Sequence, residues 1–334
     1  MHAGRVMKPL LDFVAKVAID AQDQITFRGW PAQPPSQPDA PFAQQLTEFV
    51  YKYFYTHPGG NIGEAFGDGA PSAALIADIS TANDTTAKVE DGWVVRSLLS
   101  EGAVIAERYG KVCKFISGQF LAAPDAAPVR PGSGIVVTHL AGSKTVQPGF
   151  FHIFGQSQLD AAEEVKNIRL YFNLIGPGAA APVAGLVSQV LNRYLVPFRY
   201  KTATRICDYS RVDTAVLYIP ERAFTVAAMA LATQLPQLAL YLDDAVPAFT
   251  LRVGNGLGLA EDMPDAGSFG AARCKLVAQA MMQARAENHI VPETFQAAFE
   301  AVCRSENLDI DRLHLNAGSV ACYRLCAQPA AHAA

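Results

Sequence analysis

The 334-residue chain has few charged residues and no excess of cations. Charged side chains make up 17% of the sequence, and 31 acidic residues outnumber 27 basic ones. A disordered chain combines low hydrophobicity with high net charge, whereas 50% of these residues are hydrophobic. A dedicated nucleic-acid binder needs surplus cations to neutralise phosphates. The composition therefore predicts a globular protein with a sizeable core and no nucleic-acid partner.

The sequence also lacks any apolar run near the roughly 20 residues that span a bilayer. Its N-terminal stretch is interrupted by Asp12, Lys16 and Asp20, which predicts an amphipathic helix and not a signal peptide. The six cysteines form no C-x-x-C pair, and Cys322 with Cys326 lacks a histidine partner for zinc. We therefore expect a cytoplasmic protein with reduced thiols, no membrane segment and no metal site.

Several catalytic motifs are missing as well. There is no H-E-x-x-H pair for a metal and no G-x-S-x-G elbow of a serine hydrolase. The segment GNGLGLAE (254–261) has the wrong glycine spacing for a dinucleotide site, and no Walker lysine follows it. We expect this segment to be a flexible loop over a pocket.

The pattern along the chain predicts an α+β fold with N-terminal helices, an antiparallel β meander, and then a mixed α/β core with flanking helices. Helical spacing at 8–21 and 42–56 brackets a proline-rich loop, and short β-type runs fill 92–155. From residue 166 strands and helices alternate. The predicted parts are a helical segment at 1–60, a β-rich part at 61–165, an α/β part with the site at 166–325, and a disordered tail at 326–334.

Cations lie on the polar faces of several predicted strands. Alternation places Arg169, Tyr171 and Asn173 on one strand face, and Arg199 with Lys201 on another. Further such groups are the set Tyr209, Arg211 and Asp213, and the single Arg252. Each alone is typical of an ordinary half-exposed strand. Together, in a chain poor in charge, they predict an anion pocket, most plausibly for phosphate.

Two further features allow a functional or a structural interpretation. Ser268 opens a helix that carries Arg273 one turn in, which suits either an anion at the helix start or a plain N-cap with a surface arginine. We expect the plain cap. His152 lies in a strand, where a lone histidine is more often structural than catalytic, and it remains a candidate acid.

Seven segments occur in an order that resembles the HopA family of bacterial type III effectors and its non-pathogen relatives: DGWVVRSLL, QPGFFHIFG, RLYFNL, PFRYK, YSRVDTAVLY, PAFTLRVGNGLGLAE and SFGAARC. The resemblance covers roughly residues 45–285, which implies one compact unit over that range. Relatives in peptide natural-product clusters are similar to phosphothreonine/phosphoserine lyases of class V lanthipeptide and thioviridamide-type pathways. In those pathways a separate kinase-like phosphotransferase phosphorylates a precursor peptide that carries a leader region. The lyase then eliminates phosphate to leave dehydroalanine or dehydrobutyrine.

This resemblance implies roles for the residues on the strand faces. Elimination needs a base for the Cα proton, cations for the phosphate and an acid for the leaving oxygen, and no cofactor. Lys201 is the candidate base. His152 is the candidate acid, with Tyr209 as the alternative, because relatives often carry another residue at position 152. The candidate phosphate and substrate contacts are Arg169, Tyr171, Asn173, Arg211, Asp213, Arg252, Ser268 and Arg273.

Two other functions fit the same sequence. A non-catalytic subunit would hold the precursor peptide or the kinase, and a type III effector-like protein would act on a host partner. An effector needs a secretion segment, whereas this N-terminus predicts an ordinary folded helix. The absence of kinase signatures fits a stand-alone lyase.

Overall fold

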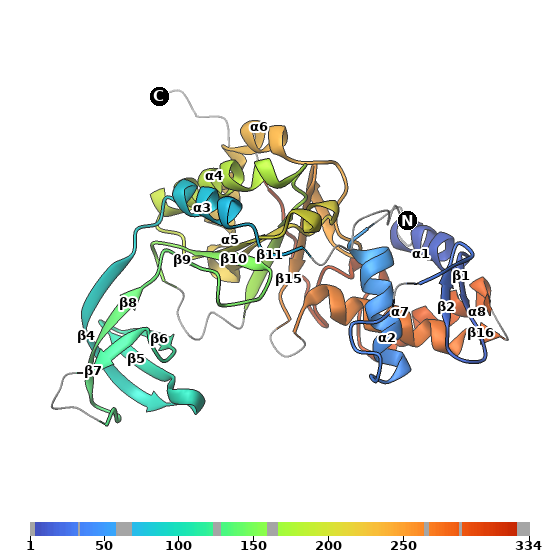
Figure 1. Cartoon of the computed structure of the whole chain (residues 1–334), viewed down its shortest axis with the longest axis horizontal. Helices are drawn as coiled ribbons and strands as arrows, with labels where there is room; N and C mark the ends of the chain where they lie inside the picture. Colours follow the sequence, from blue (N-terminus) through green and yellow to red (C-terminus); the bar gives the residue numbers. More distant parts are fainter. Residues whose placement is uncertain are drawn as a thin grey trace.

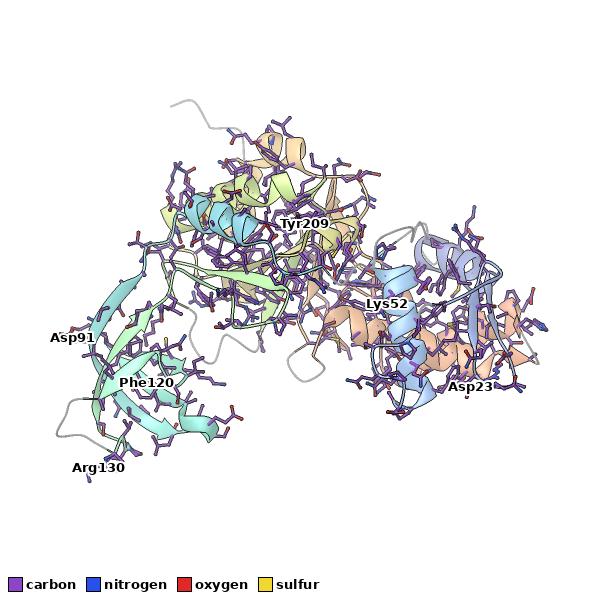
Figure 2. All side chains as sticks on the ribbon, in the orientation of Figure 1. Asp23, Lys52, Asp91, Phe120, Arg130 and Tyr209 are labelled. Atoms are coloured by element: carbon purple, nitrogen blue, oxygen red, sulfur yellow. The ribbon has the colours of Figure 1, made fainter. Side chains whose placement is uncertain are left out.

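The structure, a computed structural model, describes residues 4–32, 34–57, 69–122, 128–158, 166–263, 267–286 and 289–325. Figure 1 shows three parts along the long axis: a small sheet at one end, a larger sheet with helices in the centre, and a mainly helical part at the other end. Phe120, Tyr209 and Lys52 mark these parts in turn in Figure 2. Helices combined with antiparallel sheets confirm the predicted α+β class. The predicted tail at 326–334 lies outside the described residues.

The central sheet has seven strands, each antiparallel to its neighbours. In spatial order they are β14 (Leu251–Gly254), β15 (Leu257–Glu261), β11 (Asn167–Phe172), β13 (Ala215–Pro220), β12 (Arg199–Ala203), β10 (Phe150–Phe154) and β9 (Gly142–Ser143). One face buries Leu170, Leu217 and Leu259 against the helices α3 (Ala73–Ala82), α4 (Ala180–Arg193) and α5 (Phe224–Ala232). The other face carries Tyr171 and Tyr218, and we call it the site face.

A second sheet of five strands forms the small end part. Its order is β6 (Lys111–Phe115), β5 (Val104–Arg108), β4 (Lys88–Leu98), β8 (Gly134–His139) and β7 (Phe120–Ala122). A separate apolar cluster around Trp93 and Phe115 holds it together. The predicted meander is therefore split, because β9 and β10 join the central sheet instead.

The helical end part combines both ends of the chain. It contains α1 (Gly4–Val14), β1 (Val17–Ile19), β2 (Ile25–Phe27), β3 (Trp30–Pro31), α2 (Phe42–Val50), α7 (Phe269–Gln283), β16 (Arg285–Ala286), β17 (His289–Ile290) and α8 (Pro292–Ser305). Helix α2 packs against α7, and α1 packs against α8. A π-helical turn, Tyr51–Tyr55, extends α2 toward the central sheet. Among the described residues no single helix is long and apolar enough to cross a membrane, although a bent pair, Glu221–Ala232 and Leu235–Tyr241, meets that test by length and composition.

The helix predicted over 8–21 is wrong in its second half. Helix α1 ends at Val14, and Val17–Ile19 forms a hairpin with Ile25–Phe27. The Asp20 carboxylate accepts hydrogen bonds from the backbone N–H groups of Gln22 and Gln24, both at 2.9 Å, and this arrangement closes the turn. An aspartate that binds its own following backbone favours a turn over a helix.

The flexible loop predicted over 254–261 is also wrong. Leu257–Glu261 is β15, a fully buried strand in the central sheet. Gly256 has a φ of 62° in the turn before it, and a Cβ there would collide with the Asp243 carbonyl oxygen. Its neighbour Gly258 lies so close to Thr250 that a Cβ would meet Oγ1 at 2.6 Å. The glycines therefore allow close packing of buried backbone and do not indicate a mobile loop.

Gly270→Ala should destabilise the protein, although alanine normally favours a helix. The new Cβ would lie 2.6 Å from Cζ of Tyr55 and 2.9 Å from Cε2 of Tyr51, so the buried Tyr55 ring and the half-buried Tyr51 ring must shift. Overpacking of this kind costs about 1–3 kcal/mol, more than the gain of up to about 1 kcal/mol in helix propensity. Thermal unfolding should show a lower Tm. The control is Gly178→Ala, where nothing lies within 4 Å of the added Cβ, and a Tm that falls equally in both variants contradicts the packing argument.

Candidate functional site

Three cations surround one tyrosine ring on the site face. The register of β11, β13 and β12 places Arg169, Tyr218 and Arg199 in one row across neighbouring strands. The guanidinium carbons of Arg169 and Arg199 lie 5.2 and 4.5 Å from the Tyr218 ring centroid, and the Lys201 ammonium lies 5.8 Å from it. Cations at such distances are attracted to the negative face of an aromatic ring. We call these four residues the Tyr218 cluster.

The three cations differ in how their charge is balanced. The Arg169 side chain donates to the Asp262 carboxylate from Nε at 2.7 Å and to the Gly267 carbonyl at 3.1 Å. The Lys201 ammonium donates to the Gln147 side-chain oxygen at 3.0 Å and lies 4.4 Å from the Phe150 ring centroid.

Arg199 has no carboxylate partner within the described parts of the chain, and its buried Nε has no hydrogen-bond partner there. Arg199 and Lys201 are thus two neighbouring cations without a carboxylate between them. Like charges at this spacing repel, and an anion bound beside them would relieve the repulsion. This arrangement is what an anion-binding site requires.

His152 lies opposite Lys201 in the register of β10 and β12. Its side chain is 3% exposed, and neither ring nitrogen has a hydrogen-bond partner among the described residues. Burial, together with the charges of Arg199 and Lys201, lowers the pKa of His152 to about 3. The imidazole is therefore neutral near pH 7 and carries no extra proton to donate. A neutral imidazole suits the role of a base better than the role of general acid predicted for His152.

A buried ion pair borders the Tyr218 cluster. The Arg211 guanidinium binds the Asp213 carboxylate through two hydrogen bonds of 2.8 and 2.9 Å, and the Tyr51 hydroxyl donates to the same carboxylate at 3.1 Å. Burial alone would raise the pKa of Asp213, but the Arg211 charge and these hydrogen bonds hold it below its usual range. Arg211 is therefore neutralised by its partner, and it is not a free phosphate-binding cation.

Tyr171 lies on the site face in the same row as Lys201, with Val216 between them. Its hydroxyl is buried and has no hydrogen-bond partner among the described residues. Burial raises the pKa of Tyr171 to about 12, and the nearby Arg169 charge opposes that rise. Tyr171 therefore remains a neutral phenol that can donate a hydrogen bond.

Tyr209 does not reach the site face, which corrects its assignment as the alternative acid. Residues Ile206–Ser210 form a 3₁₀ helix, so the strand alternation assumed for this segment does not apply. The Tyr209 hydroxyl donates to the Ala203 carbonyl at 2.8 Å and lies beside Thr202, which points to the face opposite Lys201. Figure 2 shows Tyr209 in the central part of the molecule.

Arg252 also lies apart from the cluster. It is on the edge strand β14, two strand spacings from β11, which carries Arg169, and four from β12, which carries Arg199 and Lys201; these spacings correspond to about 10 and 19 Å. Its guanidinium binds the Asp244 carboxylate at 2.8 Å. Asn173 donates to the Ala245 carbonyl at 3.0 Å and so holds in place the segment 243–247, which contains Asp244.

The helix start at Ser268 has the plain capping role that we expected. The Ser268 hydroxyl accepts the backbone N–H of Ala271 at 3.1 Å. Arg273 is not a surface arginine, however, because it is 2% exposed and donates to the carbonyls of Leu313 and Leu315, both at 2.7 Å. It joins α7 to the segment after α8 and cannot contact a ligand in the Tyr218 cluster.

The prediction of one pocket with five cations therefore needs revision. The structure brings Arg169 and Lys201 together, places Arg211 beside them in an ion pair, and separates Arg252 and Arg273. The sequence analysis noted Arg199 only as a neighbour of Lys201 and missed Tyr218 and Gln147. Alternation along Ala215–Pro220 places Tyr218 on the same strand face as Val216, and this was the available signal. Among the described residues, no three His, Cys, Asp or Glu side chains are arranged to hold a metal ion.

Asp213→Asn should destabilise the protein because it leaves the Arg211 charge without its partner. Breaking a buried pair of this kind costs about 3 kcal/mol. The wild-type contribution is present above the usual aspartate pKa and is lost as the pH falls through the lowered pKa of the folded state. Urea unfolding should therefore show a large difference between wild type and variant at pH 7 that shrinks in acid.

The matched control is Glu107→Gln, which breaks the exposed pair with Arg96. Exposed pairs contribute up to about 1 kcal/mol. Equal losses in the two variants, or a difference for Asp213→Asn that does not change with pH, contradict the assigned role of the ion pair.

Comparison with solved structures shows a similar fold in one effector protein. The effector from Pseudomonas syringae pv. tomato strain DC3000 aligns with a TM-score of 0.50 and 13% identity, covering 94% of this chain and 98% of that one. The effector from Pseudomonas syringae pv. syringae strain 61 aligns with a TM-score of 0.44 and 16% identity, covering 82% and 96%. No curated protein matches the sequence.

A sequence profile gives the family. The profile of the HopA1 effector protein family matches residues 141–315, just over half of the chain. The matched segment includes β10 to β15 and α7, and hence the whole Tyr218 cluster, His152 and the Arg211–Asp213 pair. The chain therefore belongs to the HopA1 effector protein family.

Proposed function

We propose that this chain is a phospho-Ser/Thr lyase that removes phosphate from a kinase-phosphorylated precursor peptide in the cytoplasm. The product is dehydroalanine or dehydrobutyrine, as in lanthipeptide or thioamide-type peptide biosynthesis. A separate kinase-like phosphotransferase would supply the phosphorylated peptide. The observation that carries the proposal is the Tyr218 cluster, in which Arg199 and Lys201 lie side by side without a carboxylate partner among the described residues.

The reaction is a β-elimination. A base takes the Cα proton of the phosphorylated residue, the C–H electrons form the Cα=Cβ double bond, and the Cβ–O bond breaks with its electrons on the departing phosphate. The cations must bind the phosphate and stabilise the charge that grows on its bridging oxygen. Arg199 is suited to this role because a guanidinium binds phosphate oxygens through two donors, and its Nε has no hydrogen-bond partner among the described residues.

Within this proposal Lys201 is the base and Tyr171 orients the peptide or stabilises the enolate. Arg169 contributes charge, but its Nε and one terminal nitrogen already bind Asp262 and Gly267. No organic cofactor or metal is required, because base, cations and a hydrogen-bond donor suffice for this elimination. Stabilisation of the leaving phosphate by Arg199 takes the place of the acid role first assigned to His152.

The neutral His152 suggests a rival base. It lies next to Lys201, and one of its two ring nitrogens carries an unshared electron pair with no partner among the described residues. The Lys201 contacts to Gln147 and Phe150 suit a protonated ammonium, which must lose its proton before it can act. The two assignments predict different dependence on pH.

Wild-type protein incubated with a phosphothreonine peptide should yield a product lighter by one molecule of phosphoric acid, as measured by mass spectrometry. The assay should include the leader-bearing precursor and its cognate kinase. Arg199→Gln should weaken binding of the phosphopeptide at least tenfold and leave binding of the unphosphorylated peptide unchanged, while Arg96→Gln on the five-stranded sheet should change neither. If wild type releases no phosphate from any of these substrates, the lyase proposal fails.

Lys201→Arg should abolish elimination and preserve phosphopeptide binding, because arginine keeps the charge but does not give up its proton near pH 7. General-base catalysis contributes about 10²–10⁴-fold, and a loss in that range is expected. The rate of the wild-type protein should rise with pH if Lys201 must deprotonate. A rate that is constant above pH 5, retained in Lys201→Arg and lost in His152→Gln, assigns the base to His152 instead, since its pKa is about 3.

A second candidate is an effector-like or scaffolding protein that binds a partner without turnover. The similarity to a Pseudomonas syringae protein described as an effector supports it. In that case the phosphopeptide or the kinase should co-elute with the chain in gel filtration while mass spectrometry detects no loss of phosphate.

A further inference from the structure

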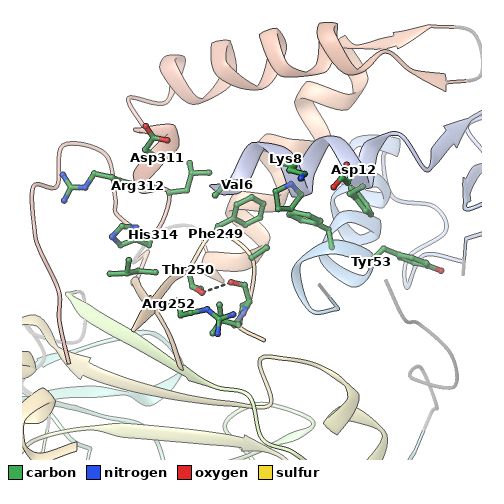
Figure 3. Close-up of a pocket in the computed structure, with 18 of the residues that line it drawn as sticks. Val6, Lys8, Asp12, Tyr53, Phe249, Thr250, Arg252, Asp311, Arg312 and His314 are labelled. Atoms are coloured by element: carbon green, nitrogen blue, oxygen red, sulfur yellow. Dashed lines mark hydrogen bonds between the residues drawn. The ribbon is translucent and has the colours of Figure 1, made fainter. Parts of the chain in front are cut away.

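A large cavity opens at the β14 edge of the central sheet, away from the Tyr218 cluster. Its volume is about 1040 Å³, and it is lined by α1, the π-helical turn, the segment 246–252 and residues 311–314. Figure 3 shows Lys8 and Asp12 on α1, with Phe249 and Arg252 on the segment that faces them. A volume at the upper end of the range for ligand sites can hold several residues of a peptide.

The cavity combines an aromatic floor with a basic rim. Phe13, Phe27, Phe54 and Phe249 line it, and these rings pack on one another with centroids 5.1–5.6 Å apart in three of their pairs. The cations that line it are Lys8, Lys16, Arg28, Arg252 and Arg312, whereas the carboxylates are Asp12 and Asp311. The chain as a whole carries a net charge of −4, whereas the lining of the cavity is net positive.

Two cations on the α1 side of the cavity are available to a ligand: Lys8 on α1 and Lys16 in the turn after it. Lys8 and Lys16 are both exposed and form no ion pair within the described residues. Arg252 is bound to Asp244, and Arg312 donates to the Ala321 carbonyl. These two arginines line the rim, but part of their hydrogen-bonding capacity is already used. The unbalanced charge is thus concentrated on the α1 side.

We infer that this cavity binds an acidic amphipathic peptide segment, in which carboxylates alternate with bulky apolar side chains. Apolar side chains of such a segment would bury against the four phenylalanine rings, and its carboxylates would lie against Lys8 and Lys16. Charge complementarity selects this occupant, because a basic or neutral segment would leave the rim cations unpaired. The site is separate from the Tyr218 cluster, and peptide binding there requires no elimination chemistry.

If the proposed lyase function also holds, the geometry sets a minimum number of residues between the acidic segment of the peptide and its phosphorylated residue. The cavity reaches Arg252 on β14, and Lys201 lies about four strand spacings away, or about 19 Å. An extended peptide covers about 3.3–3.6 Å per residue, so at least about six residues would separate the acidic segment from the phosphorylated residue. This consequence rests on the proposed function, whereas binding to the cavity does not.

The test is fluorescence anisotropy with a labelled twelve-residue peptide in which Glu and Asp alternate with Leu and Phe. It should bind the wild-type protein with a Kd in the micromolar range that weakens as salt is raised. Lys8→Glu/Lys16→Glu should weaken binding at least tenfold, whereas the control Lys114→Glu, an exposed lysine on β6, should not. Both lysines of the double variant are exposed, and circular dichroism should show that it folds.

Two results would overturn the inference. The first is equal binding of a peptide with Lys in place of Glu and Asp, or no effect of the double variant. The second is a concentration-dependent dimer in sedimentation that Lys8→Glu/Lys16→Glu converts to monomer, which assigns the cavity to a second copy of the chain. Elimination from a short phosphothreonine peptide without an acidic segment should be equal in wild type and the double variant. A loss of phosphate release there would concern the lyase proposal and not this cavity.

Discussion

The stacking of guanidinium groups on the Tyr218 ring is the interaction on which the site face of the central sheet depends. Antiparallel register brings Arg169, Tyr218 and Arg199 into one row, and adjacent strands lie only about 4.8 Å apart. Arg169 and Arg199 lie on the two strands that flank β13, two strand spacings or about 10 Å apart, and two cations repel across that distance. The ring between them offers its negative face to both, and weakly hydrated guanidiniums lose little when they stack. The row can therefore hold two arginines although, in the described part of the chain, only Arg169 has a carboxylate partner.

An aromatic wall holds this face against the N-terminal helices. Tyr55 lies between Phe249, Phe269 and the backbone of Gly270, and Tyr51 stacks on Tyr55 with centroids 5.1 Å apart. Since Tyr51 also donates to Asp213, the π-helical turn ties the packing of α7 to the ion pair beside the Tyr218 cluster. The same wall faces the cavity through Phe54 and Phe249 on its other side. Helix packing and the charged site are thus parts of one assembly.

Local pattern predicted most elements of the fold, but it did not predict how strands pair. Periodicity located α4, α7, α8 and most of the longer strands, because each buries one side of a regular element. It placed a helix over Val17–Ile19, where a hairpin sealed by Asp20 forms instead, and it treated Leu257–Glu261 as a loop. The first error arises from the turn that Asp20 closes, which is a local contact, and the second arises from strand pairing in the central sheet. Strand Leu257–Glu261 pairs with the preceding β14 and with β11, and the local sequence pattern does not reveal β11, which is distant along the chain.

The candidate site shows the same limit for a different reason. Alternation assigns a residue to a strand face, but it does not determine whether a cation finds a carboxylate there. Arg211, Arg252 and Arg273 were candidate phosphate-binding cations in the sequence, whereas Arg199 was noted only as a neighbour of Lys201. In the folded chain Arg211 is bound by Asp213 and Arg252 by Asp244. Arg273 is bound by two backbone carbonyls.

A candidate anion-binding site on this acidic protein is therefore marked by cations without carboxylate partners among the described residues, not by the number of cations. Arg199 and Lys201 lie at one position on the site face, and Lys8 and Lys16 lie beyond its β14 edge. The Arg252–Asp244 pair and the aromatic wall stand between them. Because neutralised and apolar groups separate the two places, each can attract an anionic group without competing for the other's ligand. Screening in salt acts over about 8–10 Å, less than the four strand spacings between β12, which carries Arg199 and Lys201, and the β14 edge. A peptide with a phosphate at one point and carboxylates at another matches that distribution of charge.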